Sequence, residues 1–150
     1  MKDLRITPIK NGSVIDHIRP GMALRVLKML ELNDEKKTIS IAMHAHSEKE
    51  GYKDIVKIED KELKPREVNR LAIVSPNSTI NIIRDFQVVQ KYKVNMPEVI
   101  EGIVKCENLN CITNQREPVE TKMIRTCDDP PTFRCFYCGR YQREMEKHII

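Results

Sequence analysis

The feature that most constrains this chain of 150 residues is the spacing of its cysteines. Four of the five form two pairs, Cys106 with Cys111 in CENLNC and Cys135 with Cys138 in CFYC, separated by 23 residues. Four thiolates are a favoured tetrahedral ligand set for zinc, and a C-x2-C loop brings two sulfur atoms to one ion. Gly139, directly after the second pair, permits the tight turn that such a loop needs. We therefore expect one zinc ion per chain.

Disulfide bonds are the alternative use of paired cysteines, and the sequence disfavours them. The cysteine count is odd, and the first ten residues, MKDLRITPIK, contain no apolar segment typical of a signal peptide. The longest apolar runs, such as LAIV at 71–74, are far too short to span a membrane. We therefore expect a cytoplasmic protein with no membrane partner, in a reducing compartment where thiols persist.

The expected zinc ion is structural rather than catalytic, because four protein thiolates leave no coordination position for water. Residues 98–150 are few and their apolar side chains are scattered, so a metal ion has to replace a large core. The stretches EPVETKMIRTC and TFRCFYCGRYQREM alternate roughly as short strands do. The sequence predicts a small β-rich zinc domain over 98–150 that unfolds without metal. Cys127 reads as a small buried or surface thiol, and His148 as a solvated residue of the tail.

The first 97 residues show an alternating order of strand and helix patterns. Leu4 and Ile6 indicate a strand, the Asn-Gly pair at 11–12 a hairpin turn, and SVIDHI the returning strand. Helices are predicted in GMALRVLKMLEL and LKPREVNRLAIVS, each with a proline near its start. Strands are predicted in TISIAMHAH, YKDIVKIE and, as one or two segments, TINIIRDFQVVQKYKV. On the TISIAMHAH strand, one face should carry Ile39, Ile41, Met43 and Ala45.

This order is the split βαβ, or ferredoxin-like, pattern of an α+β protein. We expect a four-stranded antiparallel sheet with both helices on one face. Pro97, in VNMPEV at 94–99, ends regular structure shortly before the cysteines begin. The predicted domains are therefore residues 1–97 and residues 98–150.

Few residues of the first domain suggest chemistry. Asp16 and His17 are adjacent on a predicted strand and should point to opposite faces, which argues against a catalytic dyad. His44 and His46 share a face and fit a polar strand surface better than a metal pair. Lys53 and Lys57 project from one side of a strand, so that they either hold an anion or form a solvated face. Neither a P-loop, a dinucleotide fingerprint nor a nucleophile elbow is present, so we expect no catalytic activity.

The charge distribution narrows the class of partner. The formal net charge is +4; residues 1–99 carry 18 basic and 14 acidic residues, and residues 100–150 carry eight of each. A zinc-ribbon protein that binds nucleic acid is the main alternative function, but it usually carries a denser basic surface. An enzyme with a structural zinc and a free-standing nucleotide sensor are further alternatives. The mild positive charge fits a small anionic ligand, and we expect no nucleic-acid partner.

Four segments in order carry a resemblance to a known family: GSVIDHI, KDIVKIE, STINIIRDFQVV and CENLNCITN followed by CFYC. They resemble the regulatory chain of aspartate carbamoyltransferase, from about Leu4 to about Tyr141. The resemblance implies a non-catalytic subunit of pyrimidine biosynthesis, whose N-terminal domain binds the nucleoside triphosphates CTP, UTP and ATP. It also implies that the zinc domain contacts the catalytic chain, and that dimers of regulatory chains bridge catalytic trimers.

The resemblance also implies which residues bind the effector. Asp16 and His17 fall near ribose and phosphate, and Lys53, Lys57 and Lys91 near ribose and the triphosphate. The base pocket would be lined by Ile6, Thr7, Pro8, Ile9, Asn81, Ile83, Phe86 and Val88. This chain departs from well-known members of the family at Thr7, where they have an acidic residue, and at Phe86, where they have tyrosine. We therefore expect the triphosphate contacts to match the family better than the base contacts.

Overall fold

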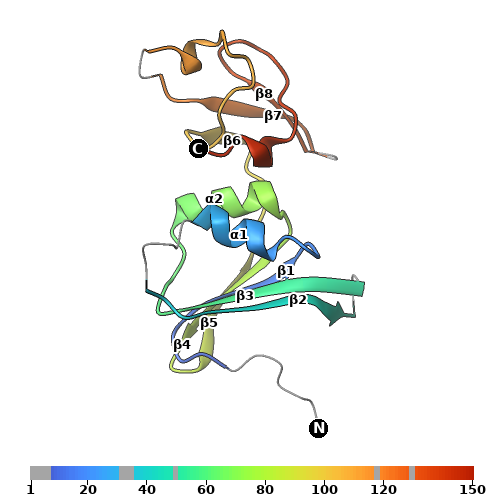
Figure 1. Cartoon of the computed structure of the whole chain (residues 1–150), viewed down its shortest axis with the longest axis vertical. Coiled ribbons are helices and arrows are strands. Elements are labelled where there is room, and N and C mark those ends of the chain that lie inside the picture. The colour runs from blue at the N-terminus through green and yellow to red at the C-terminus, as the bar shows by residue number, and fades with distance from the viewer. Residues whose placement is uncertain (1–7, 31–35, 49–50, 117–118, 129–130) are drawn as a thin grey trace. The chain divides into compact units, whose positions relative to one another are not determined.

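The structure of the chain is a computed structural model, and it describes residues 8–30, 36–48, 51–116, 119–128 and 131–150. The chain divides into two compact units, Met1–Asn95 and Met96–Ile150. Each unit has a sheet and a core of its own (Figure 1). No helix among the described residues is both long enough and apolar enough to cross a membrane.

The described residues of the first unit form seven helices and strands in chain order. They are β1 Gly12–Ile18, α1 Ala23–Leu30, β2 Ile39–Ser47, β3 Gly51–Glu59, α2 Pro65–Val74, β4 Thr79–Arg84 and β5 Gln87–Lys93. The strands form one antiparallel sheet in the order β2-β3-β1-β4-β5. Both helices cover the same face of this sheet (Figure 1). The predicted α+β class and ferredoxin-like pattern are confirmed.

The sheet has five strands rather than the expected four. Asp85 and Phe86 both adopt positive φ, 51° and 64°, and turn the chain back on itself after β4. The returning strand, β5, then pairs with the outer edge of β4. The segment that the sequence allowed as one or two strands is therefore a hairpin.

The core of the first unit lies between the helices and the sheet. On β3 the residues Asp54, Val56 and Ile58 are buried, whereas the alternating positions are only half-buried. Both predicted helices form with apolar residues inward. α1 buries Ala23, Val26, Met29 and Leu30 at helical spacing, and α2 buries the four consecutive residues Leu71 through Val74. Pro65 occupies the start of α2, where its missing N–H costs nothing.

The Asn-Gly pair does not form the predicted hairpin turn. Gly12 is the first residue of β1 and pairs with Glu59 on one side and Ile83 on the other. Its φ is +141°, and a Cβ atom there would lie against the carbonyl oxygen of Ile58. Gly12 is thus required by close approach of two strands. The predicted strand at Leu4 and Ile6 lies outside the described residues.

A β-bulge in β2 interrupts the predicted alternation. The register shifts in β2 between Ala42 and Ala45, where His44 has a φ of 58°. Ile41 pairs with Val56, on the helix side, whereas Ala45 pairs with Lys53 on the other side. The prediction that Ile39, Ile41, Met43 and Ala45 share one face is therefore wrong, because a bulge adds one residue and reverses the side-chain direction.

Asp54 holds the bulge in β2. One of its carboxylate oxygens accepts a hydrogen bond of 2.9 Å from the His44 backbone N–H, and the other accepts one of 2.9 Å from the Ala23 N–H at the start of α1. A carboxylate at this position also suits the positive end of the helix. The contact with α1 places Asp54 on the helix side, so Lys53 and Lys57 project from the opposite face, together, as predicted. We call that opposite side the open face.

The second unit contains a three-stranded antiparallel sheet in the order β6-β7-β8. Its elements are β6 Val99–Glu101, η2 Ile112–Asn114, β7 Lys122–Asp128, β8 Pro131–Cys135 and η3 Met145–Lys147. Ile100, Met123 and Phe133 are fully buried and form its small core. The predicted short strands in this region are confirmed.

The end of the chain is not a free tail. The carbonyl oxygen of His148 accepts a hydrogen bond of 2.7 Å from the N–H of Lys105, and the N–H of Ile150 donates one of 2.7 Å to Ile103. Ile149 forms an antiparallel bridge with Val104. The His148 side chain is still about a third exposed, but its backbone is paired with residues 103–105 and is not part of a free tail.

Candidate functional site

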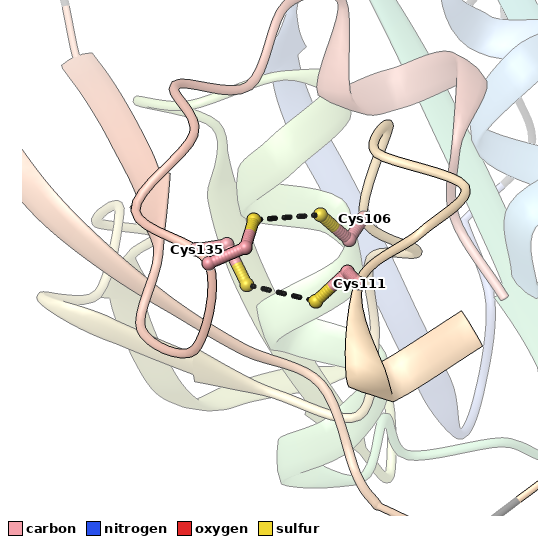
Figure 2. A group of neighbouring side chains, drawn as sticks. Cys106, Cys111 and Cys135 are labelled. Carbon is pink, nitrogen blue, oxygen red and sulfur yellow. Dashed lines mark hydrogen bonds between the residues drawn. The ribbon is translucent and has the colours of Figure 1, made fainter. Parts of the chain in front are cut away.

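The four paired cysteines meet at one point in the second unit. Their sulfur atoms all lie within 4.8 Å of one another, and the side chains of Cys106, Cys111 and Cys135 point toward a common centre (Figure 2). The Cys106 and Cys138 sulfurs are 3.7 Å apart, and those of Cys111 and Cys135 are 3.6 Å apart. Within the described part of the chain, this is the only group of three or more His, Cys, Asp and Glu side chains placed to hold a metal ion.

These distances fit a tetrahedral metal ion and exclude disulfides. A disulfide requires sulfur atoms about 2.05 Å apart. Four sulfurs at a zinc–sulfur distance of about 2.3 Å in a tetrahedron are about 3.8 Å apart. The observed separations of 3.6 and 3.7 Å are close to that value. The residues present therefore fit a structural zinc, which would hold the two cysteine loops together.

Backbone N–H groups beside the sulfurs offset part of the cost of burying a thiolate. N–H groups of Tyr137 and Cys138 donate to the sulfur of Cys135, and the N–H of Arg140 donates to the sulfur of Cys138. Gly139 has a φ of 76° and donates its own N–H to the Cys135 carbonyl, so the predicted tight turn is confirmed. Such converging donors stabilise negative charge on sulfur.

The thiols differ in their surroundings. Burial raises the pKa of Cys106 to about 12, and it also raises the pKa of Cys135. Burial would likewise raise the pKa of Cys138, but hydrogen bonds from Arg140, Asn108 and the neighbouring thiols outweigh it and lower the value to about 7. Cys138 is also the one cysteine of the four that is not buried.

Cys127 lies outside the cluster, as predicted, and is exposed on β7. His44 and His46 are likewise not part of any metal-binding group among the described residues. His46 instead packs edge-on against Tyr52, with ring centroids 6.2 Å apart.

A second candidate site lies on the open face of the first unit. Lys57 on β3 pairs with Val14 on β1, which pairs with Asn81 on β4, which pairs with Lys91 on β5. Side chains of directly paired residues lie on the same face. Strands are spaced about 4.8 Å apart, so the two lysine backbones are about 14 Å apart, with Asn81 between them. Burial lowers the pKa of Lys57, which indicates that its ammonium is partly removed from water.

Asp16, His17 and Lys53 meet next to this row. The Lys53 ammonium lies 2.9 Å from Asp16, and the Asp16 carboxylate also accepts a hydrogen bond of 2.7 Å from the His17 N–H. The expectation that Asp16 and His17 point apart is wrong. His17 has a φ of 58° at a bulge in β1, and this brings its ring nitrogen within 3.8 Å of the carboxylate.

The end of the open face at the β4–β5 hairpin, away from Asp16, His17 and Lys53, is apolar. Ile83 pairs with Val88 across the β4–β5 hairpin, and Phe86 at the hairpin turn is 65% exposed. The Phe86 N–H donates to the carbonyl oxygen of Lys10, which brings the segment containing Pro8 and the buried Ile9 beside the turn. The remaining predicted residues, Ile6 and Thr7, lie outside the described residues.

Sequence reasoning missed the residues that support the sulfurs. The amide of Gln142 contacts the Cys106 sulfur at 3.6 Å, and the hydroxyl of Thr113 contacts the Cys111 sulfur at 3.3 Å. Asn114 donates to the carbonyl oxygens of Cys106 and Asn108. Thr113 and Asn114 could have been suspected from their closeness to Cys111 in sequence. No local pattern points to Gln142, because it reaches a cysteine 36 residues away.

Comparison with known proteins accounts for both units. The family described as "Aspartate carbamoyltransferase regulatory chain, allosteric domain" matches residues 4–95, and the one described as "Aspartate carbamoyltransferase regulatory chain, metal binding domain" matches residues 98–148. This chain belongs to the aspartate carbamoyltransferase regulatory chain family. It is a regulatory, non-catalytic subunit with an allosteric and a metal-binding domain.

Aspartate carbamoyltransferase regulatory chains from several organisms are similar along nearly their whole length. That of Archaeoglobus fulgidus is 46% identical over 152 residues, which cover 99% of each chain. That of Methanothrix thermoacetophila is 49% identical over 140 residues, covering 93% of this chain and 91% of the relative. That of Pyrobaculum islandicum is 51% identical over 142 residues, covering 93% and 94%. The predicted regulatory chain is thereby confirmed over the nucleic-acid-binding alternative.

Proposed function

We propose that this chain senses nucleoside triphosphates for a cytoplasmic aspartate carbamoyltransferase in pyrimidine biosynthesis. CTP, UTP and ATP would bind the open face of the domain predicted for residues 1–97. Zinc would hold the domain predicted for residues 98–150, which docks on the catalytic chain. Pairs of regulatory chains would bridge catalytic trimers. The row of side chains from Lys57 through Asn81 to Lys91, with an apolar surface at one end, is the observation that carries this proposal.

The open face has an apolar end and a positively charged part, which correspond to the base and the phosphates of a nucleotide. Phe86 and Val88, next to the buried Ile83, offer an exposed apolar surface against which a base can pack. Lysines 53, 57 and 91 face away from that end and offer flexible ammonium groups to phosphates. A nucleotide bound in this orientation would place its base at the β4–β5 hairpin and its phosphates over β3, β1 and β5.

The charge balance of the open face favours an anion. Four lysines, Lys53, Lys57, Lys91 and Lys93, stand against two carboxylates, Asp16 and Glu59. Asp16 already neutralises Lys53 in part, at 2.9 Å. Partial burial of Lys57 disfavours its charged form, and a bound phosphate would offset that cost. The site is therefore suited to a polyanion rather than to a metal cation.

The second unit has the surface of a docking module. Its two cysteine loops carry exposed apolar side chains: Leu109 at 75% exposure from the first loop, and Phe136 and Tyr137 from the second. Exposed apolar groups of this kind are typical of protein interaction surfaces. A metal ion that fixes both loops would also fix this surface, so that docking depends on zinc.

Regulation requires that the effectors bind the two quaternary states of the enzyme with different affinities. Coupling free energies between such sites are typically about 1–3 kcal/mol. CTP and ATP would compete for the same open face and differ only at the base, where Pro8 lacks a backbone N–H. The choice between activation and inhibition then depends on contacts at the apolar end.

The test is equilibrium binding of CTP and ATP to the full chain by calorimetry. Lys91→Met and Lys57→Met should each weaken both nucleotides by about 10-fold or more, because a hydrogen bond to a charged group contributes about 1.5–3 kcal/mol. Lys28→Met, which removes an exposed lysine from α1 on the covered face, is the matched control and should leave affinity unchanged. Equal affinities in all four proteins would refute the open-face site.

Docking has a separate test. The regulatory and catalytic chains are assembled, and the metal is then removed with a mercurial and a chelator. We expect free catalytic trimers by native mass spectrometry. An assembly that persists after measured zinc loss would refute the docking role of the zinc domain without affecting the nucleotide site.

A further inference from the structure

The four sulfur atoms of the metal centre are not equally protected. Cys106, Cys111 and Cys135 are no more than 2% exposed, whereas Cys138 is reached by solvent. A reagent or a competing chelator therefore approaches the centre most easily from the side of Cys138. Cys106, whose sulfur lies 3.7 Å from that of Cys138, is closed off by protein atoms.

Gln142 covers the side of Cys106. This residue follows β8 and is itself only 8% exposed. Its amide nitrogen lies 3.6 Å from the Cys106 sulfur and also donates a hydrogen bond of 2.8 Å to the carbonyl oxygen of Arg140. Its amide oxygen accepts a hydrogen bond of 2.9 Å from the N–H of Glu107, the residue after Cys106. One buried amide thus bridges the two cysteine loops and contacts a metal ligand.

Glu107 makes the return connection. Its carboxylate accepts a hydrogen bond of 2.6 Å from the N–H of Arg143, directly after Gln142. Glu107 therefore donates a hydrogen bond to Gln142 and accepts one from the next residue, Arg143. The same carboxylate lies 3.7 Å from the His148 ring, and the chain end pairs with residues 103–105. The last nine residues are thereby held over the first cysteine loop.

We propose that Gln142 is a positioning residue that locks the Cys106 loop onto the metal and shields the Cys106 sulfur, so that metal loss begins at Cys138. An amide donor near a thiolate stabilises its negative charge and lowers its nucleophilicity. Once Cys138 has detached, Gln142 keeps the other loop in place and favours rebinding. This proposal rests on zinc occupying the four-cysteine site, as proposed above.

The order of cysteine modification tests the proposal in the unaltered protein. The full chain, with its zinc content first confirmed by elemental analysis, is treated with limiting iodoacetamide, and modified peptides are counted by mass spectrometry. Cys127, exposed and outside the cluster, gives the reference rate. We expect Cys138 to be the first ligand modified and Cys106 the last. Modification of Cys106 as early as Cys138 would overturn the proposal, and a zinc-free chain would instead refute its premise.

Variants of Gln142 test the shielding directly. Gln142→Met keeps a side chain of similar length but loses all three hydrogen bonds, and zinc transfer to a chromophoric chelator should accelerate by about 10–100-fold. Cys106 should also move forward in the order of modification. Gln142→Glu should have the same effect, since it can accept from Glu107 but cannot donate to sulfur. Zinc transfer at the wild-type rate, with Cys106 still last, would overturn the proposal.

Asn114→Ala is the matched control. Asn114 donates to the carbonyl oxygens of Cys106 and Asn108, at 2.9 and 2.7 Å, so it ties down the same loop without touching a sulfur. Its loss should speed zinc transfer but leave Cys106 the last cysteine to react. If Asn114→Ala and Gln142→Met change the order alike, Gln142 acts only by general stiffening, and shielding is refuted. The order in the unaltered chain remains decisive if a Gln142 variant fails to fold.

Discussion

The ammonium of Lys53 lies 2.9 Å from the carboxylate of Asp16 and joins β3 to β1 on the open face of the sheet. The two side chains are only 18% and 23% exposed. This pair sets the charge at one end of the proposed nucleotide site.

Replacing Asp16 by Asn should strengthen the binding of inorganic triphosphate, because it releases Lys53 from its partner. A partly exposed ion pair contributes about 1 kcal/mol, which corresponds to roughly fivefold in affinity. Calorimetric titration at constant salt measures the change. Asp60→Asn, at the far end of β3, is the control and should have little effect. Weaker triphosphate binding to Asp16→Asn would contradict the role given to this pair.

Replacing Phe86 by glycine should weaken base recognition without destabilising the β4–β5 hairpin. The Phe86 φ of 64° is unfavourable for a side chain, so Phe86→Gly should leave the melting temperature unchanged or raise it. The same change removes the aromatic surface, and affinity for CTP and ATP should fall by about 1–3 kcal/mol, the range for stacking of a base. Inorganic triphosphate should bind as before. Equal losses for nucleotide and triphosphate would place the base elsewhere.

Gly12 should tolerate no side chain. In Gly12→Ala the new Cβ would meet the Ile58 carbonyl oxygen between two central strands, and φ is +141°. We expect a loss of about 3 kcal/mol or more in the free energy of unfolding of the first unit. Urea denaturation followed by circular dichroism measures it. Gly51→Ala also has positive φ, but its new Cβ would have no neighbouring atom within 4 Å, so this change should cost less.

Zinc affinity should rise steeply with pH. Burial raises the pKa of Cys106 to about 12 and raises that of Cys135, and the thiols of an unfolded chain also carry protons near neutrality, so both are protonated when the metal is absent. Zinc must displace these protons, so acid weakens binding and alkali strengthens it, by about 100-fold per pH unit for two protons. Competition with a chelator of known pH dependence measures the slope. A pH-independent affinity would mean that the thiols are already ionised.

Removal of the metal should unfold one unit only. Residues 96–150 have a small core around Phe133 and depend on the cysteine cluster, whereas the first unit buries apolar side chains between two helices and five strands. After chelation, amide hydrogen exchange should become fast in 96–150 and stay slow in β1, β3 and β4. Protection retained at Met123 and Phe133 in zinc-free protein would contradict this expectation.

The sequence by itself determined what depends on local spacing. The two cysteine pairs predicted the sulfur cluster, because a short loop fixes where two thiols can point. Helical spacing predicted α1, a proline near the start of the segment favoured α2, and alternation predicted most strands. The parallel projection of Lys53 and Lys57 also followed from alternation, since β3 is free of bulges.

The tertiary structure alone decided what depends on pairing between distant segments. Bulges at His17 and His44 are stabilised by partners across the sheet and by Asp54, and no local pattern announces them. The row from Lys57 to Lys91 exists only because four strands fix one register. The contact of Gln142 with Cys106 likewise joins residues far apart in the chain, since a side-chain hydrogen bond depends on closeness in space and leaves no periodic trace in the sequence.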